Sequence, residues 1–481
     1  MILPDFSIDI KAQVLTDLCT RLTEIGYEEL AVSKLLGRWD LSEMRGEEHP
    51  NYIWRCEQEG SDLSQVVLFF LLSRSAAPQR IAELIGEDVF EALCDSKIIL
   101  KYKDVVVFMP VLYPCLGRFI FTDQWVSAGA QAEGKIYELG TDSFVLARLT
   151  PRSGVKRALD LCTGSGIHAV FSSLSGADTQ AVDINPRAKI FTELNARLNG
   201  VSCQVHLGDL YAPVSGQTFD LITANPPFVP SPDRDVLIHR STGESGEEVP
   251  ERLVAGLPEH LTEGGMFSMV LDHPVYEHQT YLERLESWIG ETRGWGIAVL
   301  NFNLKTPAAY IVTHIGSPER EDYQQLFEKY LESYKRVGIT AMQFAHVFIK
   351  RLKEDIPNWK VEQATAWPNV DLASQMEDWL ACLTKAHSEA WQPESDWKPR
   401  LSQNYTAVWR DWNQERGALQ LADDNWIKPE FLNADEAEFL YRIKEGTQTI
   451  ASLKSDWIGD GRGEDCFEKT LRDLIFKRAL A

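Results

Sequence analysis

The stretch "ALDLCTGSGIHAV", residues 158–170, predicts a strand, a glycine turn and a helix in immediate succession. Asp160 falls near the end of the apolar run, and Gly164 and Gly166 come just before the helical residues. Glycines let the backbone turn tightly and approach a ligand closely, and the first turn of a helix offers unpaired N–H donors. The stretch therefore predicts the ligand-binding turn of an α/β fold, with His168 as a residue of the helix start rather than a base.

Short strand-like runs alternate with helical patterns around this turn, from about residue 140 to 315. This alternation is typical of a parallel sheet covered by helices. We expect the strands at residues 157–161, 179–184, 203–209, 219–225, 264–272, 296–302 and 308–315. Only a few residues, including Pro307, separate the last two, so we expect a hairpin whose last strand runs antiparallel to the rest. The sequence thus predicts a Rossmann-like, seven-stranded, mostly parallel sheet, which residues 339–352 complete or flank.

The segments on either side of this α/β region have a different pattern. Residues 64–109 predict three short helices followed by a β-branched strand, and residues 434–481 repeat much of that helical rhythm. Both patterns suggest helix-turn-helix or winged-helix units, but the expected recognition helices, 87–96 and 466–477, are not strongly basic, which favours interaction modules. We expect three domains: a helical, winged-helix-like N-terminal domain, a central α/β domain and a mainly helical C-terminal domain, over residues 1–118, 119–355 and 356–481.

Composition bounds the class of protein. The 481 residues are 44% hydrophobic and 10% aromatic, which suits two or three globular domains. No run approaches the roughly 18 apolar residues of a membrane helix, and the start "MILPDFSIDIKAQ" has acidic residues where a secretory signal is basic. The eight cysteines are scattered singly, without the spacing of a zinc site. We therefore expect a cytoplasmic protein without a metal or a membrane association.

The net charge of −23 bears on the choice of partner. A protein that holds nucleic acid through its phosphates needs a face of Lys and Arg, because counterion release supplies most of the sequence-independent affinity. The modest basic run around Lys350 to Lys353 is typical of a solvated face. Overall acidity makes binding to bare RNA harder, although it does not exclude a local basic patch.

Two further carboxylates follow expected strands. Asp183 closes the second strand, where a carboxylate can accept hydrogen bonds from both hydroxyls of a ribose; the alternative is that it caps the helix that follows. Asp209 ends the third strand and suits the exocyclic amine of an adenine, with Leu210 packed on its ring. Thr163 and Ala169 depart from the GxGxxG pattern of dinucleotide folds, so a nucleotide without a pyrophosphate fits better.

The series "LDLCTGSG", "AVDINPRA", "GDLY" and "FDLITANPPF" resembles the class I S-adenosylmethionine (SAM)-dependent methyltransferases. It is most similar to the group with the methyltransferase small domain, which includes release-factor glutamine methyltransferases and ribosomal RNA guanine-N2 methyltransferases. The resemblance covers about residues 119–318. It implies SAM as the cofactor, bound by residues at the strand ends and in the glycine turn: Asp160, Thr163, Gly164, Gly166, Asp183, Asp209, Leu210 and Asn225.

The resemblance also gives Asn225-Pro226-Pro227-Phe228 a catalytic role at the end of the fourth strand. In the family this motif lies beside the methyl group and binds a planar nitrogen, an amide or an exocyclic amine. Asn225 Oδ1 and the carbonyl of Pro226 are suitable acceptors for the N–H groups of such a nitrogen, the prolines fix the turn, and Phe228 can stack on the planar group. The alternative is a strand exit that is merely stiffened by proline.

Two neighbouring segments correspond to parts of the family site. Residues 239–265 follow the motif and suit a mobile lid, in which Arg240, Glu244 or Glu248 could contact substrate, although each taken singly is expected to face solvent. Residues 137–149 would bring three polar side chains near the methionine end of the cofactor: Thr141, Asp142 and Ser143.

These observations predict a SAM-dependent N-methyltransferase that acts on a planar nitrogen. Three acceptors stay open: a protein Gln or Asn amide, towards which the prediction leans, an exocyclic amine of an RNA purine (guanine-N2 or adenine-N6), and a small molecule. The accessory segments favour a macromolecular substrate over a metabolite, and we expect a monomer. An alternative function of another class is a non-catalytic binding module, in which the SAM pocket is retained but no longer serves catalysis.

Overall fold

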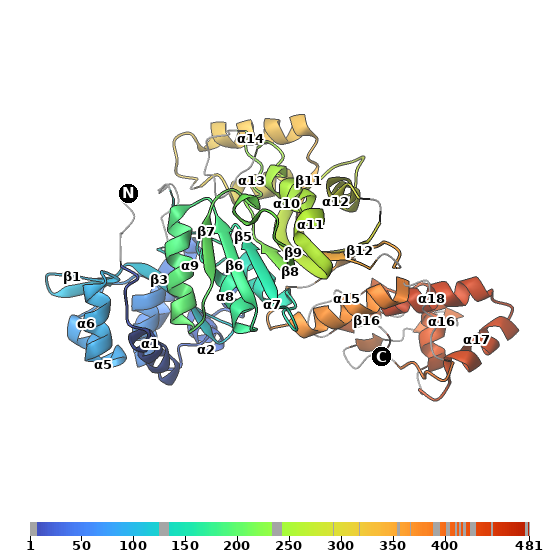
Figure 1. Cartoon of the computed structure of the whole chain (residues 1–481), viewed down its shortest axis with the longest axis horizontal. Helices are drawn as coiled ribbons and strands as arrows, with labels where there is room; N and C mark the ends of the chain where they lie inside the picture. Colours follow the sequence, from blue (N-terminus) through green and yellow to red (C-terminus); the bar gives the residue numbers. More distant parts are fainter. Residues whose placement is uncertain are drawn as a thin grey trace.

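A single large sheet organises the chain (Figure 1). The computed structural model describes residues 7–124, 134–232, 243–291, 293–316, 318–353, 356–365, 367–387 and 395–400, and most of 405–480 with short gaps. Within these residues the sheet has eight strands in the order β12-β10-β11-β9-β8-β5-β6-β7, and β11 alone runs antiparallel to its neighbours. The strands are β5 (Arg157–Leu161), β6 (Asp178–Asp183), β7 (Gln204–Leu207), β8 (Phe219–Ala224), β9 (Leu261–Val275), β10 (Trp295–Lys305), β11 (Ala341–Arg351) and β12 (Trp359–Ala364).

The first six expected strands are confirmed, but the seventh is wrong. Residues 308–315 lie mostly in a helix, α13 (Pro307–Val312), because the Thr306 side chain accepts a hydrogen bond from the Ala309 N–H and Pro307 suits the first helical turn. The antiparallel strand is β11, which lies between β9 and β10 and completes the sheet as residues 339–352 suggested. With β12 at the edge, the sheet has eight strands rather than seven. The Rossmann-like, mostly parallel architecture is as expected.

Both faces of the sheet are covered by helices, as the alternation of side chains along β9 shows. Met269 and Leu271 point into a core with α10 (Glu248–Ala255), α11 (Leu257–His260) and α12 (Tyr281–Ile289). Val270, between them, points to the opposite face and packs with residues of α7 (Thr141–Leu149). Helix α8 (Ile167–Leu174) packs beside both α7 and α9 (Pro186–Leu198). This arrangement buries the apolar strands on both sides and leaves their carboxyl ends as the place for a ligand.

The N-terminal segment packs on α9. Its elements include α1 (Ala12–Glu24), α2 (Glu29–Leu36), α3 (His49–Glu59), α4 (Asp62–Val66), α5 (Pro78–Ile85), α6 (Glu87–Asp95), and the hairpins β1 (Ile99–Tyr102)–β2 (Val105–Phe108) and β3 (Pro110–Cys115)–β4 (Arg118–Asp123). Asn195 of α9 joins the two parts, since its side chain accepts from the Phe121 N–H at 2.7 Å and donates to the carbonyls of Phe121 and Ser165. The apolar core is therefore continuous from these helices to α8 and α9.

The C-terminal segment extends away from the sheet and is attached to it through α15 (Ala373–His387) (Figure 1). Trp379 of α15 is fully buried in a core that also contains Leu149 of α7 and Leu300 of β10. The described residues beyond α15 form five short strands, β13 (Tyr405–Val408), β14 (Asp411–Trp412), β15 (Glu415–Arg416), β16 (Gln420–Asp423) and β17 (Glu430–Phe431), and then helices α16 (Ala434–Ile443), α17 (Ile450–Gly459) and α18 (Glu464–Phe476). In the part of the chain that the structure describes, every helix is too short or too polar to span a bilayer.

Candidate active site

The site is built where β5 and β8 end side by side. Asp160 of β5 is buried, and its carboxylate accepts hydrogen bonds from the Thr163 hydroxyl at 2.5 Å and from the Thr223 hydroxyl of β8 at 2.8 Å. Burial raises the pKa of Asp160 to about 6, against the lowering effect of these hydrogen bonds. Asp160 therefore fixes the start of the glycine turn to the neighbouring strand.

The two glycines of the turn serve different needs. Gly166 has φ of +79°, and a Cβ there would lie 2.6 Å from Thr192 Cγ2 of α9, so only glycine allows this close approach. Gly164 has φ of +53°, and the nearest atom to an added Cβ would be the Cys162 carbonyl oxygen at 4.0 Å. Gly166 thus permits packing, whereas Gly164 borders open space in which a ligand can approach the backbone.

Asp183 connects the end of β6 to the glycine turn. Its Oδ2 accepts from the Gly164 N–H at 2.9 Å and its Oδ1 from the Asn185 N–H at 2.8 Å. The helix cap is Asn185, which accepts from the Arg187 N–H, so the alternative reading of Asp183 as the cap of α9 is wrong. Burial raises the pKa of Asp183. The backbone N–H groups of Asn185, Gly164 and Ile184 oppose this shift, and because a carboxylate has about four acceptor positions, one position suits a further donor such as a ribose hydroxyl.

Asp209 and Leu210 lie beyond the end of β7. Asp209 is about half-exposed and its Oδ2 accepts from Arg252 Nη2 of α10 at 2.7 Å. Leu210 is buried in the core that contains Leu161 and Val182, with φ of +47°. The predicted contacts of this pair with an adenine remain a prediction.

The carboxylates at three neighbouring strand ends lie near enough to the Cys162 thiol to influence its pKa. Burial raises the pKa of Cys162, and the nearby charges of Asp183, Asp160 and Asp209 raise it further. The structure therefore brings these three sequence-predicted residues to one edge of the sheet, around the glycine turn.

Asn225 is the first residue after β8 and is held from the side by α7. Its Nδ2 donates to Asp142 Oδ2 at 3.0 Å, while Asp142 Oδ1 accepts from the Ser143 N–H at 2.9 Å. Because the amide nitrogen is engaged with Asp142, Asn225 Oδ1 is directed to the other side. Thr141, the first residue of α7, donates instead to the Ser42 carbonyl of the N-terminal segment at 3.1 Å.

The remaining residues of the motif, 226–228, connect the end of β8 to the core beneath α10. Phe228 is half-buried against the core of α10, and Gly246 lies so close to its carbonyl that an added Cβ would collide with it. Pro226 and Pro227 occupy the turn between Asn225 and Phe228, outside the strand ladder.

The predicted lid is anchored by a residue that the sequence did not single out. Glu247, at the start of α10, is buried, and its Oε1 accepts from Arg284 Nε of α12 at 2.9 Å. By contrast, Glu248 is exposed, and Glu244 forms a 2.6 Å ion pair with Arg336 in which both side chains are about half-exposed. Arg240 lies outside the described residues. As expected, neither Glu244 nor Glu248 is buried at the site.

The connection between β10 and β11 packs against the segment after the Asn-Pro-Pro-Phe motif; its helix over residues 321–338 is predictable from the sequence, but this contact is not. The connection contains α13 and α14 (Tyr323–Val337). From α14, Tyr334 donates to the Pro230 carbonyl at 3.2 Å, and the Tyr330 hydroxyl lies 3.1 Å from that of Ser231. These contacts fasten the segment after the Asn-Pro-Pro-Phe motif. The spacing of aromatic residues along 323–334 was the available signal.

Asp272 on β9 is the other residue that was missed. Burial raises its pKa to about 7; the charge of Lys305 and the nearby Tyr310 hydroxyl oppose this shift, and the charge of Asp142 adds to it. An acidic residue at the end of the fifth strand, in "VLDHP", was the available signal.

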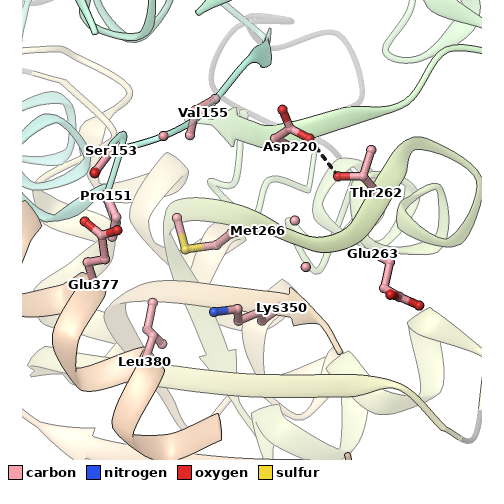
Figure 2. Close-up of a pocket in the computed structure, with 13 residues that line it drawn as sticks. Pro151, Ser153, Val155, Asp220, Thr262, Glu263, Met266, Lys350, Glu377 and Leu380 are labelled. Carbon is pink, nitrogen blue, oxygen red and sulfur yellow. Dashed lines mark hydrogen bonds between the residues drawn. The ribbon is translucent and has the colours of Figure 1, made fainter. Parts of the chain in front are cut away.

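A pocket of about 300 Å³ lies at the opposite end of the sheet (Figure 2). Asp220 at the start of β8 accepts from the Thr262 hydroxyl at 3.0 Å, and Lys350 at the end of the antiparallel β11 lines the same pocket. Burial lowers the pKa of Lys350, and the charge of Glu377 opposes this effect. Lys350 is thus half-buried rather than part of a solvated basic face, and the pocket is remote from Asn225.

Comparisons with known proteins bear on residues 135–294, which match the family model of the methyltransferase small domain. A putative protein N5-glutamine methyltransferase from Methanocaldococcus jannaschii is 29% identical over 152 residues, 30% of this chain and 77% of that protein. Methyltransferase HEMK2 from Homo sapiens is 32% identical over 158 residues, 30% of this chain and 74% of that protein. The ribosomal protein uL3 glutamine methyltransferase from Bradyrhizobium diazoefficiens is 35% identical over 126 residues, 24% of this chain and 40% of that enzyme.

The aligned part therefore spans most of two relatives but less than half of the third. The residues at the strand ends also fit the adenosyl part of SAM, because Gly164 borders open space and the Asp183 carboxylate beside it can accept a further hydrogen bond. The fold, the glycine turn and the identity to these relatives together decide the family. The chain belongs to the SAM-dependent methyltransferases of the methyltransferase small domain family.

Proposed function

We propose that this enzyme methylates the side-chain amide of a glutamine or asparagine in a protein substrate. The observation that carries the proposal is the hydrogen bond from Asn225 Nδ2 to Asp142 Oδ2, which directs Asn225 Oδ1 towards an incoming N–H group. The relatives that are named as N5-glutamine methyltransferases support an amide as the acceptor. SAM supplies the methyl group when it is bound.

The proposed role of the motif follows from the chemistry of a planar nitrogen. An amide nitrogen is a poor nucleophile because its lone pair is delocalised into the carbonyl group. Asn225 Oδ1 and the Pro226 carbonyl would accept its two N–H groups, hold it in place and draw it towards a pyramidal geometry. Pro226 and Pro227 would keep these acceptors fixed, and Phe228 would stack on the amide plane.

The proposed binding of SAM uses the residues around the glycine turn. Asp183 would accept from the ribose hydroxyls, and Asp209 and Leu210 would contact the adenine. Asp160, Thr163, Gly164 and Gly166 would shape the turn, while Asn225 would lie beside the methyl group. The deep burial of Asp160 supports a shaping role for this residue rather than direct contact.

The flanking segments support a macromolecular acceptor. We propose that residues 1–118 and 356–481 act as docking domains on either side of the catalytic domain, residues 119–355, in a monomeric cytoplasmic enzyme. The net charge of −23 disfavours a bare RNA acceptor. The alternative methyl acceptors are an exocyclic amine of an RNA purine and a small molecule. Each would present a planar nitrogen to the same motif.

The test uses purified enzyme, radiolabelled SAM and an undermethylated cell lysate, with the products divided between RNase and protease digestion. Loss of macromolecular label on protease treatment supports a protein amide. Loss on RNase treatment would overturn the proposal in favour of an RNA amine, and absence of macromolecular label would favour a metabolite. Asn225→Ala should abolish labelling, whereas Gln204→Ala, which removes an exposed side-chain amide at the start of β7, should not.

A further inference from the structure

Asp272 lies at the carboxyl end of β9, next to the strand that carries the Asn-Pro-Pro-Phe motif. Ala224, the last residue of β8, pairs with Met269 of β9, so Asp272 lies three residues beyond this pair in the direction of the motif. Side chains alternate along a strand, so Asp272 points to the same face as Val270, which packs with α7. This is the face from which Asp142 reaches Asn225.

Four elements present titratable or charged groups to the Asp272 carboxylate. These are Asp142 on α7, Lys305 at the end of β10, Tyr310 on α13 and Tyr334 on α14. The Tyr310 hydroxyl lies close enough to Asp272 to lower its pKa, and Lys305 Nζ lies 5.7 Å from the centre of the Tyr310 ring. Asp142 is itself occupied by Asn225 and by the Ser143 N–H. Of the two carboxylates in this cluster, Asp142 accepts the hydrogen bond from Asn225, whereas Asp272 is not its partner in that bond.

We propose that Asp272 takes up the proton that the acceptor nitrogen loses during methyl transfer. The inference rests on the proposed function, because it requires an N–H acceptor held by Asn225. In this step the N–C bond forms, the S–C bond breaks with its electron pair going to sulfur, and the N–H proton passes to the Asp272 carboxylate. Water then removes the proton, since Asp272 is half-buried rather than buried as a whole residue.

The surroundings of Asp272 suit this role. Burial raises the pKa of Asp272 to about 7, so the carboxylate can both take up a proton and return it to water near neutral pH. The Tyr310 hydroxyl and Lys305 keep the pKa from rising further, and the charge of Asp142 acts in the opposite direction. The carboxylate must be ionised to accept the proton, so the rate should increase as the pH rises through about 7.

The first experiment measures single-turnover methyl transfer between pH 5.5 and 9 with whichever acceptor class the digestion assay identifies. The wild-type rate should rise with a midpoint near 7. Asp272→Asn should lose this dependence and react about 100-fold more slowly at pH 8, with unchanged affinity for SAM. Asp272→Glu should restore part of the rate. Tyr310→Phe and Lys305→Met should move the midpoint upwards, because each removes a group that lowers the pKa of Asp272.

The second experiment follows the aspartate carboxyl groups by ¹³C NMR during a pH titration of the enzyme without SAM. A resonance with a midpoint near 7 should be absent in Asp272→Asn, should move up in Tyr310→Phe and should move down in Asp142→Ala. This measurement does not depend on the identity of the acceptor, so it separates this inference from the proposed function. The inference is overturned if no such resonance exists, or if Asp272→Asn retains the wild-type pH profile or loses SAM binding.

Discussion

Asn225 Nδ2 donates a 3.0 Å hydrogen bond to Asp142 Oδ2 and so joins the exit of β8 to the first turn of α7. The two residues are far apart in sequence, yet this contact determines which side of the Asn225 amide carries the oxygen. The acceptor geometry of the motif thus depends on a residue outside the motif.

Replacement of Asp142 should therefore impair catalysis more than cofactor binding. In Asp142→Ala the Asn225 amide loses a charge-assisted partner worth about 1.5–3 kcal/mol, so we expect kcat to fall roughly 10- to 100-fold. Asp142→Asn keeps a side-chain oxygen that can accept, so its loss should be smaller. Steady-state kinetics and calorimetric SAM binding measure both effects, and an unchanged kcat in Asp142→Ala would contradict this role.

The close packing of Gly166 against α9 gives a stability prediction. Gly166→Ala places a Cβ 2.6 Å from Thr192 Cγ2 at a positive φ, so strain and overlap should lower the free energy of unfolding by roughly 2–4 kcal/mol. Gly176→Ala is the matched control, because its φ is +91° and an added Cβ would meet no atom within 4 Å. Urea denaturation should show the smaller loss for Gly176→Ala, and equal losses would mean that the contact with Thr192 relaxes freely.

The raised pKa of Asp160 predicts a specific pH dependence of stability. The folded-state pKa of about 6 exceeds the ordinary value of 3.8, so folding favours the protonated carboxyl. Its contribution is fully present below about pH 3.8 and is lost as the pH rises through about 6. At about 1.4 kcal/mol per pKa unit, the effect is at most about 3 kcal/mol.

Asp160→Asn removes this titration. The free energy of unfolding of the variant, minus that of the wild type, should therefore increase between about pH 4 and 6 and remain constant above that range. Urea unfolding at several pH values measures the difference. A constant difference over this range would show that Asp160 titrates at its ordinary pKa.

The ion pairs of the two lid-region glutamates should differ strongly in their effect on stability. Arg284→Met leaves the buried Glu247 without its cation and should cost about 3–5 kcal/mol. Arg336→Met breaks the half-exposed pair with Glu244 and should cost less than about 1 kcal/mol. Chemical denaturation of both variants provides the comparison, and similar losses would refute the assignment of Glu247 as the anchor of α10.

The sequence predicted the elements whose signals are local. The strands that end at Leu161, Asp183 and Ala224 are short apolar runs followed by turn residues, and they form at the expected places. The error at 308–315 arose because an apolar run has the same appearance in a short helix and in a strand; the Thr306 cap and Pro307 favour the helix.

Contacts between distant residues could not be predicted in this way. That Glu247 rather than Glu248 is buried depends on Arg284 of another helix, and the pKa of Asp272 depends on its burial and on groups from α7, β10 and α13. Such properties arise from burial and from charges brought together by folding.

The sequence by itself therefore determined the mostly parallel α/β sheet, the glycine turn and the family, because hydrophobic periodicity and short motifs are properties of contiguous residues. Only the tertiary structure decided that β11 completes the sheet between β9 and β10, that Asp142 orients Asn225, and that Asp272 lies beside them. The physical reason is that hydrogen bonding and desolvation act between neighbours in space, and the chain defines those neighbours only once it has folded.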